Sequence, residues 1–433
     1  MITLIEALNY RCLRHIRQPL RPFHVLVGPN ASGKSTFMDI LPFLGTVVTE
    51  GADAAVKRRT TNLLDLSWGR QGSSLELAIE GDLPHDKSMQ EAQGFGVVRY
   101  AVSIGLDSST KETTILDEQI ILRRQGEPPG QAIENPPLAG SLLDLSNWRR
   151  GSLGVRRWNR ETGCSLPVDR DDIAVGVVAP PHPSKSILQN LVALDSASAS
   201  LAFTEFSHSR SLGPAAWAAR WLMDVLGRDT RRLELDSPML RAASPVGSGN
   251  LLVQSGANLP WVASALEEKP PERFREWVRH LQTALPDLEG IRVVERPEDR
   301  HRYIMLRYRS GLEVPSWMLS DGTLRLLALT ILAYIPNPPN ARPIWLVEEP
   351  ENSLHPLNIE TVMQSLQSVY DGQVLVSTHS PLVLGVTKPE KVLVFSRDEE
   401  QGTTIVSGNE HPGLRDWHGE VDLGTLFASG VLG

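Results

Sequence analysis

Apolar and polar residues alternate along the chain in patterns that change twice between its ends. In the first part, Met1–Asn9 and His24–Val27 have the character of strands, and residues 37–48 have the spacing of a helix. Three further runs, separated by turn-forming residues, predict antiparallel strands: Leu75–Ile79, Val97–Ile104 and Ile115–Leu122. This part therefore predicts a strand, a loop and a helix, followed by an inserted sheet.

The middle of the chain is mainly helical, and its last third returns to strands that alternate with helices. Residues 125–183 are irregular, and the clearest helical segments after them are Ala215–Leu226 and Phe274–Leu285. Strand character follows at Gly290–Val294 and Tyr303–Tyr308. The last third contains a helix, a strand, a helix and a strand, at Leu324–Tyr334, Ile344–Val347, residues 359–369 and Val374–Val376. That alternation favours a parallel sheet with crossover helices.

Composition narrows the class of protein. The chain has 433 residues, of which 41% are hydrophobic and 22% charged, as in ordinary globular proteins. Its net charge of −8 excludes a uniformly basic nucleic-acid coat, so contact with DNA or RNA requires a local patch. The two cysteines, Cys12 and Cys164, exclude a disulfide framework and fit a reducing cytosol. The N-terminus has no signal-peptide pattern, and the longest apolar stretch, Leu326–Ile335, is far shorter than the roughly 20 residues that cross a bilayer. We expect a soluble, cytoplasmic protein without membrane contact.

A phosphate-binding loop lies between the strand at His24–Val27 and the helix that follows it. It matches the pattern G-x-x-x-x-G-K-[ST] at every position: Gly28, Pro29, Asn30, Ala31, Ser32, Gly33, Lys34 and Ser35, with Thr36 next in the helix. Glycines let the backbone N–H groups turn toward phosphates, and the helix N-terminus adds positive potential. Lys34 can bridge the β- and γ-phosphates of ATP, and the Ser35 hydroxyl can hold Mg²⁺. The alternative, an ordinary glycine turn before a helix, does not explain the full match.

Acidic residues follow the buried strand at Ile344–Val347. Because ligands of open parallel sheets bind at the carboxyl ends of strands, Glu348 is predicted to support the metal ion. Glu349 is predicted to polarise the attacking water. His379, at the tip of the next strand, would reach the γ-phosphate or that water. The alternatives are a solvated acidic turn and a structural histidine.

A second anion site is predicted where the apolar helix of the last third begins. Leu319–Thr323 precedes this helix, and Ser320 is well placed to cap it. The first turn of a helix offers free N–H groups, and the phosphates that they meet need not belong to the same chain. Ser320 and Gly322 are the candidates for this anion site, and the alternative is a simple capped core helix.

The order of these motifs resembles the ABC-type ATPase heads of the SMC, RecF and OLD groups. The segments that carry the resemblance are Asn9–Arg11, the phosphate loop, Leu319–Thr323, Glu348–Glu351 with Leu354–Pro356, and Ser377–Pro381. The match is good over residues 1–44 and about 310–390. It implies an α/β head with a parallel core sheet, an inserted antiparallel β subdomain and a helical subdomain.

The resemblance also implies a division of the chain and a mode of action. Residues 1–433 would form one discontinuous head, divided into a nucleotide-binding core at 1–44 and 311–390, an arm at 45–183, a mainly helical part at 184–310, and a C-terminal hairpin and tail at 391–433. ATP and Mg²⁺ would lie between two heads arranged head to tail, in a homodimer or higher oligomer. Glu348 stands where many relatives carry aspartate. The glutamine that relatives place between the lobes is not clear, with Gln189 the first candidate and Gln71 the second.

A basic cluster in the irregular segment leaves the partner open. Five arginines lie near Trp148 and Trp158: Arg149, Arg150, Arg156, Arg157 and Arg160. Arginine pairs with phosphates and tryptophan stacks on bases, so a nucleic-acid contact, an acidic protein partner and a structural loop are all consistent with the pattern. A second acidic group, Asp398–Glu400, precedes Gln401-Gly402 and is predicted to form a solvated hairpin turn.

Two hypotheses for function follow. The first is an ATPase that acts as a dimerisation switch on a separate effector, such as a nuclease, in anti-phage defence or DNA maintenance. The second is a repair ATPase of the RecF type that itself binds DNA. The engine of a membrane transporter is disfavoured, because no spanning segment and no transporter-type signature is present.

Overall fold

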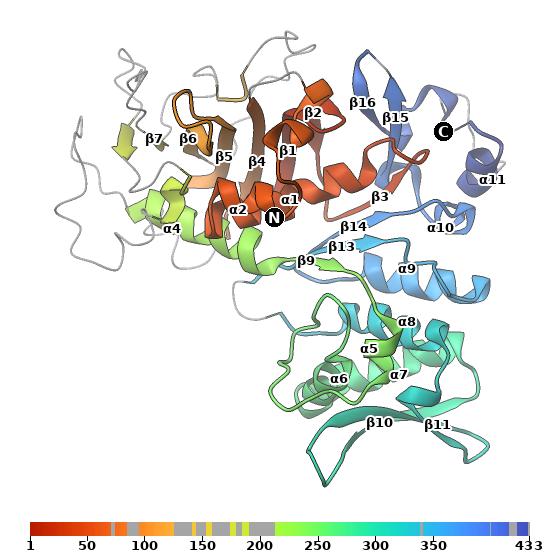
Figure 1. The fold of residues 1–433 in the computed structure, drawn as a ribbon. Coiled ribbons are helices and arrows are strands. Elements are labelled where there is room, and N and C mark those ends of the chain that lie inside the picture. The colour runs from red at the N-terminus through yellow and green to blue at the C-terminus, as the bar shows by residue number, and fades with distance from the viewer. Residues whose placement is uncertain are drawn as a thin grey trace. The chain divides into compact units, whose positions relative to one another are not determined.

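The structure is a computed structural model of the chain, and it divides into two compact units (Figure 1). It describes residues 1–70, 74–84, 95–124, 141–143, 153–157, 174–178, 184–189, 213–337, 341–398, 400–414 and 422–431. Unit 1 comprises Met1–Arg21, Asn30–Thr230 and Ser396–Ile405. Unit 2 comprises Pro22–Pro29, Arg231–Phe395 and Val406–Gly433. The domain boundaries expected from the sequence stay a prediction.

Unit 1 is built on a seven-stranded sheet in the order β2-β1-β4-β5-β6-β7-β8. Its strands are β1 (Ile2–Tyr10), β2 (Leu13–Pro19), β4 (Ser74–Asp82), β5 (Phe95–Leu106), β6 (Thr113–Arg124), β7 (Leu153–Arg157) and β8 (Ala174–Val178). All neighbours pair antiparallel except β7 and β8, which are parallel. The three strands predicted from Leu75 to Leu122 are confirmed, and the two N-terminal strands pair into the same sheet.

The helices of unit 1 include the one that follows the phosphate loop. They are α1 (Lys34–Thr49), α2 (Ala52–Lys57), α4 (Gly213–Met223) and the π-helical η5 (Asp224–Asp229), with short 3₁₀ turns η1 (Leu63–Leu66) and η2 (Trp68–Arg70). The backbone of α1 touches that of η5, since a Cβ on Gly45 would lie 2.3 Å from the Leu226 carbonyl oxygen. Asp39 of α1 accepts from the Tyr10 hydroxyl at 2.7 Å and from Arg59 Nε and Nη2 at 2.7 and 2.6 Å. The hydrogen bond from Tyr10 joins α1 to β1, and the ion pair with Arg59 joins α1 to the segment after α2.

Unit 2 is built on the parallel sheet that the sequence predicts. Its strands lie in the order β15-β3-β14-β13-β9. They are β3 (Phe23–Val27), β9 (Thr230–Leu233), β13 (Ile344–Glu348), β14 (Gln373–Ser377) and β15 (Val392–Asp398). The strand β16 (Gly402–Ser407) falls mainly in unit 1. The pairs β13–β14, β14–β3 and β15–β3 are parallel. Their near-continuous burial is expected for a parallel sheet covered on both faces.

Helices and a small sheet complete unit 2. The helices are α5 (Ser237–Arg241), α6 (Leu259–Glu268), α7 (Pro271–Ala284), α8 (Asp321–Thr330), α9 (Ile359–Gln367), α10 (Pro381–Gly385) and α11 (Leu423–Ala428). Short 3₁₀ turns are η6 (Ser316–Met318), η7 (Ile331–Ala333), η8 (Pro356–Asn358), η9 (Pro389–Lys391), η10 (Gly408–Glu410) and η11 (Pro412–Leu414). A separate antiparallel sheet contains β10 (Leu288–Glu295), β11 (Arg302–Tyr308) and β12 (Glu313–Pro315).

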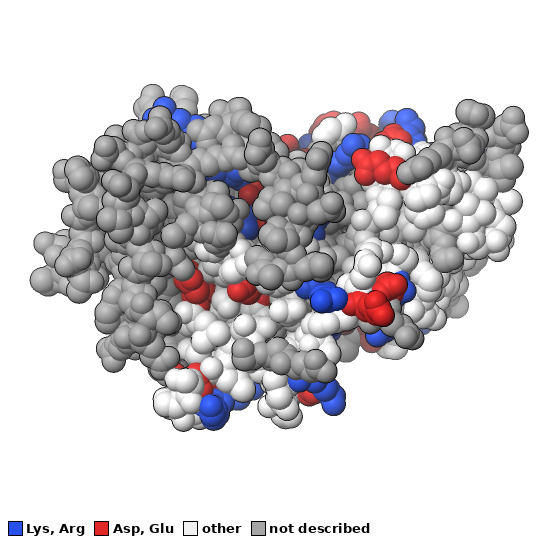
Figure 2. Space-filling model, turned by 90° about the horizontal axis from the view of Figure 1, so that it is seen from above, with Lys and Arg blue, Asp and Glu red and all other residues white. Residues whose placement is uncertain are grey.

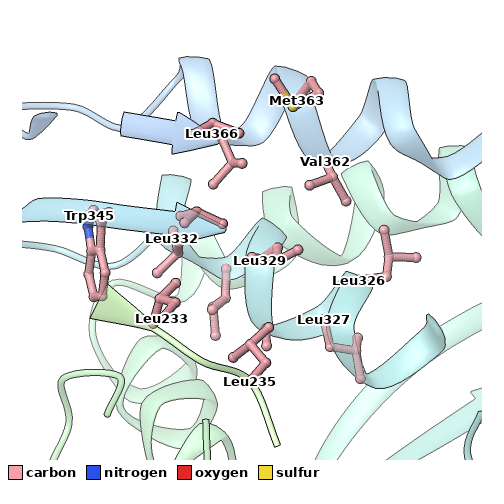
Figure 3. Close-up of a cluster of buried hydrophobic side chains, with 14 of the residues drawn as sticks. Leu233, Leu235, Leu326, Leu327, Leu329, Leu332, Trp345, Val362, Met363 and Leu366 are labelled. Carbon is pink, nitrogen blue, oxygen red and sulfur yellow. The ribbon is translucent and has the colours of Figure 1, made fainter. Parts of the chain in front are cut away.

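The core of unit 2 holds α8 in place. Leucines of α8 pack with side chains of β9, β13 and α9, as Figure 3 shows for Leu326, Leu329, Trp345 and Val362. The helix expected at Leu324–Tyr334 begins three residues earlier, at Asp321, and becomes 3₁₀ after Thr330. Within the described part of the chain, no helix is both long and apolar enough to cross a bilayer.

Candidate functional site

Three parallel strands of unit 2 end at one edge of its sheet. Leu26 of β3, Ser377 of β14 and Glu348 of β13 lie level in the register. The Thr378 amide donates to the Leu26 carbonyl at 3.1 Å, and the Glu349 amide donates to the Ser377 carbonyl at 2.8 Å. The start of the phosphate loop, the His379 turn and the acidic strand end therefore share this edge, which is where ligands of open α/β sheets bind.

The first residue of the phosphate loop must be glycine. Gly28 has φ 149°, and a Cβ there would lie 2.1 Å from the Phe395 carbonyl oxygen at the end of β15. No side chain fits into that space, because 2.1 Å is well inside van der Waals contact. Gly28 and the exposed Pro29 belong to unit 2, where they continue β3.

The rest of the loop lies in unit 1 and leads into α1. Ala31 and Gly33 have positive φ, of 62° and 106°. Asn30, Ala31 and Ser35 are exposed, whereas Ser32, Gly33 and Lys34 are buried. The Thr403 hydroxyl of β16 donates to the Ser32 carbonyl at 2.9 Å and lies where a Cβ on Gly33 would be, as does the Cys12 sulfur. Successive left-handed and helical residues make a concave nest of N–H groups, which is the backbone form that binds phosphates.

Glu348, the predicted metal carboxylate, forms an ion pair. Its Oε1 lies 2.8 Å from Arg232 Nη2, and Arg232 Nε lies 2.9 Å from Glu234 Oε1. Arg232 belongs to β9, the strand next to β13 in the sheet. The predicted metal carboxylate thus already has a cation beside it, which the sequence did not indicate.

Glu349, the predicted base, has a strained backbone. Its φ is 45°, a value that is uncommon for residues other than glycine. The side-chain amide of Asn352 donates to Glu349 Oε2 at 2.7 Å, and the backbone amide of Asn352 donates to the Glu349 carbonyl at 3.0 Å. Strain held in this way costs about 1–3 kcal/mol and concentrates at functional sites. The carboxylate is therefore kept in one orientation at the strand end.

Glu351 holds the turn that carries His379. Its Oε1 accepts from the Thr378 hydroxyl at 2.6 Å and from the His379 amide at 3.4 Å. The Thr378 hydroxyl also accepts from the Ser380 amide at 2.9 Å. Thr378 is buried and His379 is half-buried, so the imidazole lies at the surface of this edge. Glu351 ties the segment after β13 to the one after β14.

The segment Leu319–Thr323, which we call the signature segment, forms the capped start of α8. The exposed Ser320 accepts from the Thr323 amide at 3.1 Å, as the N-cap of α8. Arg241 of α5 pairs with the Asp321 carboxylate at 2.5 Å and donates to the Leu319 carbonyl at 3.1 Å. Arg241 therefore offsets the one negative charge in the first turn of α8, which otherwise opposes anion binding there.

Gly322 brings the signature segment against the turn that follows the acidic residues. A Cβ on Gly322 would lie 2.5 Å from the Ser353 carbonyl oxygen. Ser353 itself has φ 64°, so this turn is also a constrained one. The contact joins the start of α8 to the turn that follows β13.

The donor chemistry at these positions fits Mg²⁺. The predicted ligands, the Ser35 hydroxyl and the Glu348 carboxylate, are hard oxygen donors. Mg²⁺ usually takes only one or two protein ligands, with phosphates and water supplying the others. Among the described residues there is no cluster of three or more His, Cys, Asp or Glu that could hold a metal ion.

The remaining predictions fall partly outside the described residues. Arg149, Arg150 and Arg160 lie there, as does Gln71, and only the backbone of Arg156 and Arg157, in β7, is described. On the face drawn in Figure 2, described basic and acidic side chains lie next to one another and form no broad field of one sign.

Gln189 and Asp398 have local structural contacts. Gln189 Nε2 donates to the Val48 and Thr49 carbonyls at 3.0 and 2.7 Å, so its amide caps the end of α1. Asp398 Oδ1 accepts from the amides of Glu400 and Gln401 in the turn between β15 and β16. Glu399 lies outside the described residues.

Comparison with known structures supports the ATPase-head fold. The chain is similar to an SMC head bound to the C-terminal winged-helix domain of ScpA, with 16% identity, 94% of this chain and 96% of that chain covered, and a TM-score of 0.50. Weaker matches are the head from Pyrococcus furiosus with an extended coiled coil, bound to the C-terminal domain of ScpA (13% identity, 94% and 95% covered, TM-score 0.47), and the SMC head from Thermotoga maritima (11%, 94% and 98%, 0.42). No curated protein is significantly similar in sequence.

The sequence itself identifies the family. Residues 167–385, slightly more than half of the chain, match the family described as "AAA domain, putative AbiEii toxin, Type IV TA system". The matched segment contains the signature, the acidic strand end and the His379 turn. The fold is that of an SMC-like ABC-type ATPase head, and the chain belongs to this family of AAA-domain proteins.

Proposed function

We propose that the protein is an ATP-binding and ATP-hydrolysing switch, whose heads pair around ATP and thereby control a separate effector. One observation carries this proposal: the parallel register brings the ends of β3, β14 and β13 to one sheet edge. That edge holds the start of the phosphate loop, the His379 turn and the pair Glu348-Glu349.

Each residue has a role that its chemistry can perform. The loop Gly28–Ser35 binds the phosphates, and Lys34 neutralises their charge. Ser35 and Glu348 would hold Mg²⁺, which supplies charge stabilisation to the β- and γ-phosphates. Glu349 orients the attacking water and accepts its proton, and His379 donates a hydrogen bond toward the γ-phosphate. The strained, Asn352-bound conformation of Glu349 supports its role, because a base must be held in place.

A second copy of the chain completes the site in this proposal. Ser320 is exposed at the start of α8, where the first N–H groups of the helix can receive a γ-phosphate from another subunit. Ser320 and Gly322 of one head would close over the phosphate loop of its partner. Hydrolysis breaks the bond to the γ-phosphate, and release of inorganic phosphate then removes the charge that holds the two heads together, so the dimer forms only while ATP is bound.

The family description supports a separate partner protein. The family description names a toxin of a toxin–antitoxin system, which is a system of two gene products, and the SMC head that this chain resembles is bound to a domain of ScpA. We place the effector, such as a nuclease, in anti-phage defence or DNA maintenance. A repair ATPase that binds DNA directly is the alternative, and it depends on the arginines around Trp148 and Trp158.

The test is the mass of the protein in solution with and without ATP. Glu349→Gln keeps the size and polarity of the side chain but cannot accept a proton, so it should retain ATP and accumulate a dimer. Lys34→Ala is the matched control, and it should stay monomeric. Light scattering coupled to gel filtration measures this mass for both variants. If the Glu349→Gln protein binds ATP but has the same mass as without ATP, the proposal is wrong. Fluorescence anisotropy with labelled oligonucleotides tests the DNA alternative.

A further inference from the structure

Arg232 stands beside the carboxylate that is proposed to support the metal ion. Its guanidinium lies 2.8 Å from Glu348 Oε1, and the two side chains are 36% and 28% exposed. An arginine keeps its charge at any physiological pH, so it is a permanent cation at this position. A guanidinium and a metal ion compete for the same carboxylate, because each is attracted by its single negative charge.

A pocket beside Arg232 offers its guanidinium a second carboxylate partner. A pocket of about 400 Å³ opens beside Glu348, between the ends of β9 and β13 and the helix α8. Its lining includes Glu234 and Asp236, which follow β9, together with Asn352. Arg232 Nε already lies 2.9 Å from Glu234, so the guanidinium can leave Glu348 and keep a carboxylate partner.

We propose that Arg232 is a built-in counter-ion of Glu348, which Mg²⁺ must displace when it arrives with the nucleotide. The inference rests on the proposed function, since it assumes that Glu348 supports the metal ion. In the nucleotide-free protein the pair offsets the repulsion among the acidic residues at the end of β13. When Mg²⁺–ATP binds, Arg232 moves toward Glu234 and Glu348 turns to the cation. The strength of the pair thus sets the Mg²⁺ concentration at which nucleotide is held tightly.

The size of the effect follows from the exposure of the pair. Ion pairs as exposed as this one are weak, and they contribute about 0.2–1 kcal/mol in water. Removing the competitor should therefore lower the required Mg²⁺ concentration by a factor of about 1.4 to 5. A much larger change would be out of proportion to a pair that is one-third exposed.

The experiment compares Arg232→Gln with Arg231→Gln. Both remove one positive charge from β9, but the Arg231 guanidinium lies over the Trp345 ring, 5.9 Å from its centre, and its Nη1 donates to the Leu252 carbonyl at 3.4 Å. Binding of a fluorescent ATP analogue is titrated with Mg²⁺, and its affinity is measured again in EDTA. Circular dichroism confirms that both variants are folded.

The expected result is a Mg²⁺ midpoint lower by a factor of about 1.4 to 5 for Arg232→Gln, with unchanged affinity in EDTA. Arg231→Gln and Arg232→Lys should keep the midpoint of the parent. An unchanged or higher midpoint for Arg232→Gln overturns the inference, as does an equal shift in Arg231→Gln. Weaker binding of Arg232→Gln in EDTA also overturns it, because Arg232 would then contact the phosphates. If the unmutated protein binds no nucleotide at all, the proposed function fails first.

Discussion

Replacing Gly322 with alanine tests the contact between the signature segment and the turn after β13. The added Cβ would lie 2.5 Å from the Ser353 carbonyl oxygen, whereas ordinary contacts begin at 3.4 Å. The two backbones must therefore separate by about 0.9 Å to restore ordinary contact. Gly322 has no positive φ, so the perturbation is steric and does not come from its backbone conformation.

The energy can be bounded from known substitutions. Overpacking of this kind costs about 1–3 kcal/mol. Alanine recovers at most about 1 kcal/mol relative to glycine through its helix propensity, and less in a first turn. We expect Gly322→Ala to lower the free energy of unfolding by about 1–2 kcal/mol, and to weaken ATP-dependent pairing of the heads in the Glu349→Gln background.

The matched control is Gly290→Ala. A Cβ on Gly290, in β10 of the same unit, meets no atom within 4 Å. The free energy of unfolding of Gly290→Ala should stay within about 0.5 kcal/mol of that of the parent protein. Urea denaturation followed by tryptophan fluorescence measures both variants. If Gly322→Ala unfolds at the same urea concentration as Gly290→Ala and pairs normally with ATP, the close contact with Ser353 is not part of the signature site.

Two further substitutions test a buried hydrogen bond and a partly buried histidine of unit 2. Trp277 is fully buried and its Nε1 donates to the Thr330 hydroxyl at 2.9 Å, so Trp277→Phe should lower the free energy of unfolding by about 1–3 kcal/mol, measured in urea. Burial lowers the pKa of His280, whose Nδ1 lies 2.9 Å from the Tyr334 hydroxyl. In the unfolded chain His280 has the usual histidine pKa of about 6.5, so it binds a proton at a higher pH than it does in the folded protein. The free energy of unfolding should therefore fall as the pH drops below about 6.5. His280→Gln should reduce that fall relative to the parent, and equal pH profiles by thermal denaturation would argue against the contribution of His280.

The sheet edge that we propose as the nucleotide site could be anticipated from the sequence because each of its parts is local. The phosphate loop is one contiguous motif, and Glu348 and His379 each follow a short buried strand. The rule that parallel strands end at one edge was enough to bring them together. The structure adds the strain at Glu349 and the clamp by Glu351, which depend on backbone geometry that no residue pattern specifies.

The supporting contacts could not be predicted, because they join segments that are distant in the sequence. Nothing near Arg232 or Arg241 distinguishes them among 43 lysines and arginines. Thr403 and Ser32 are 371 positions apart, yet one hydrogen bond connects them. The pairing of β1 with β4 was missed for the same reason, since periodicity predicts a strand but not its neighbour.

The central claim is that a second subunit completes each ATP site, and mixing two inactive variants tests it most directly. Lys34→Ala removes the phosphate contact of one subunit. Ser320→Asp keeps the helix cap but adds a negative charge where a γ-phosphate would bind. Each variant alone should have almost no ATPase activity. In an equal mixture, a dimer of one Lys34→Ala subunit and one Ser320→Asp subunit has one intact site of two, so activity should rise well above that of either variant alone, to at most about half of the parent level. If the mixture is no more active than the two variants apart, the composite site is contradicted.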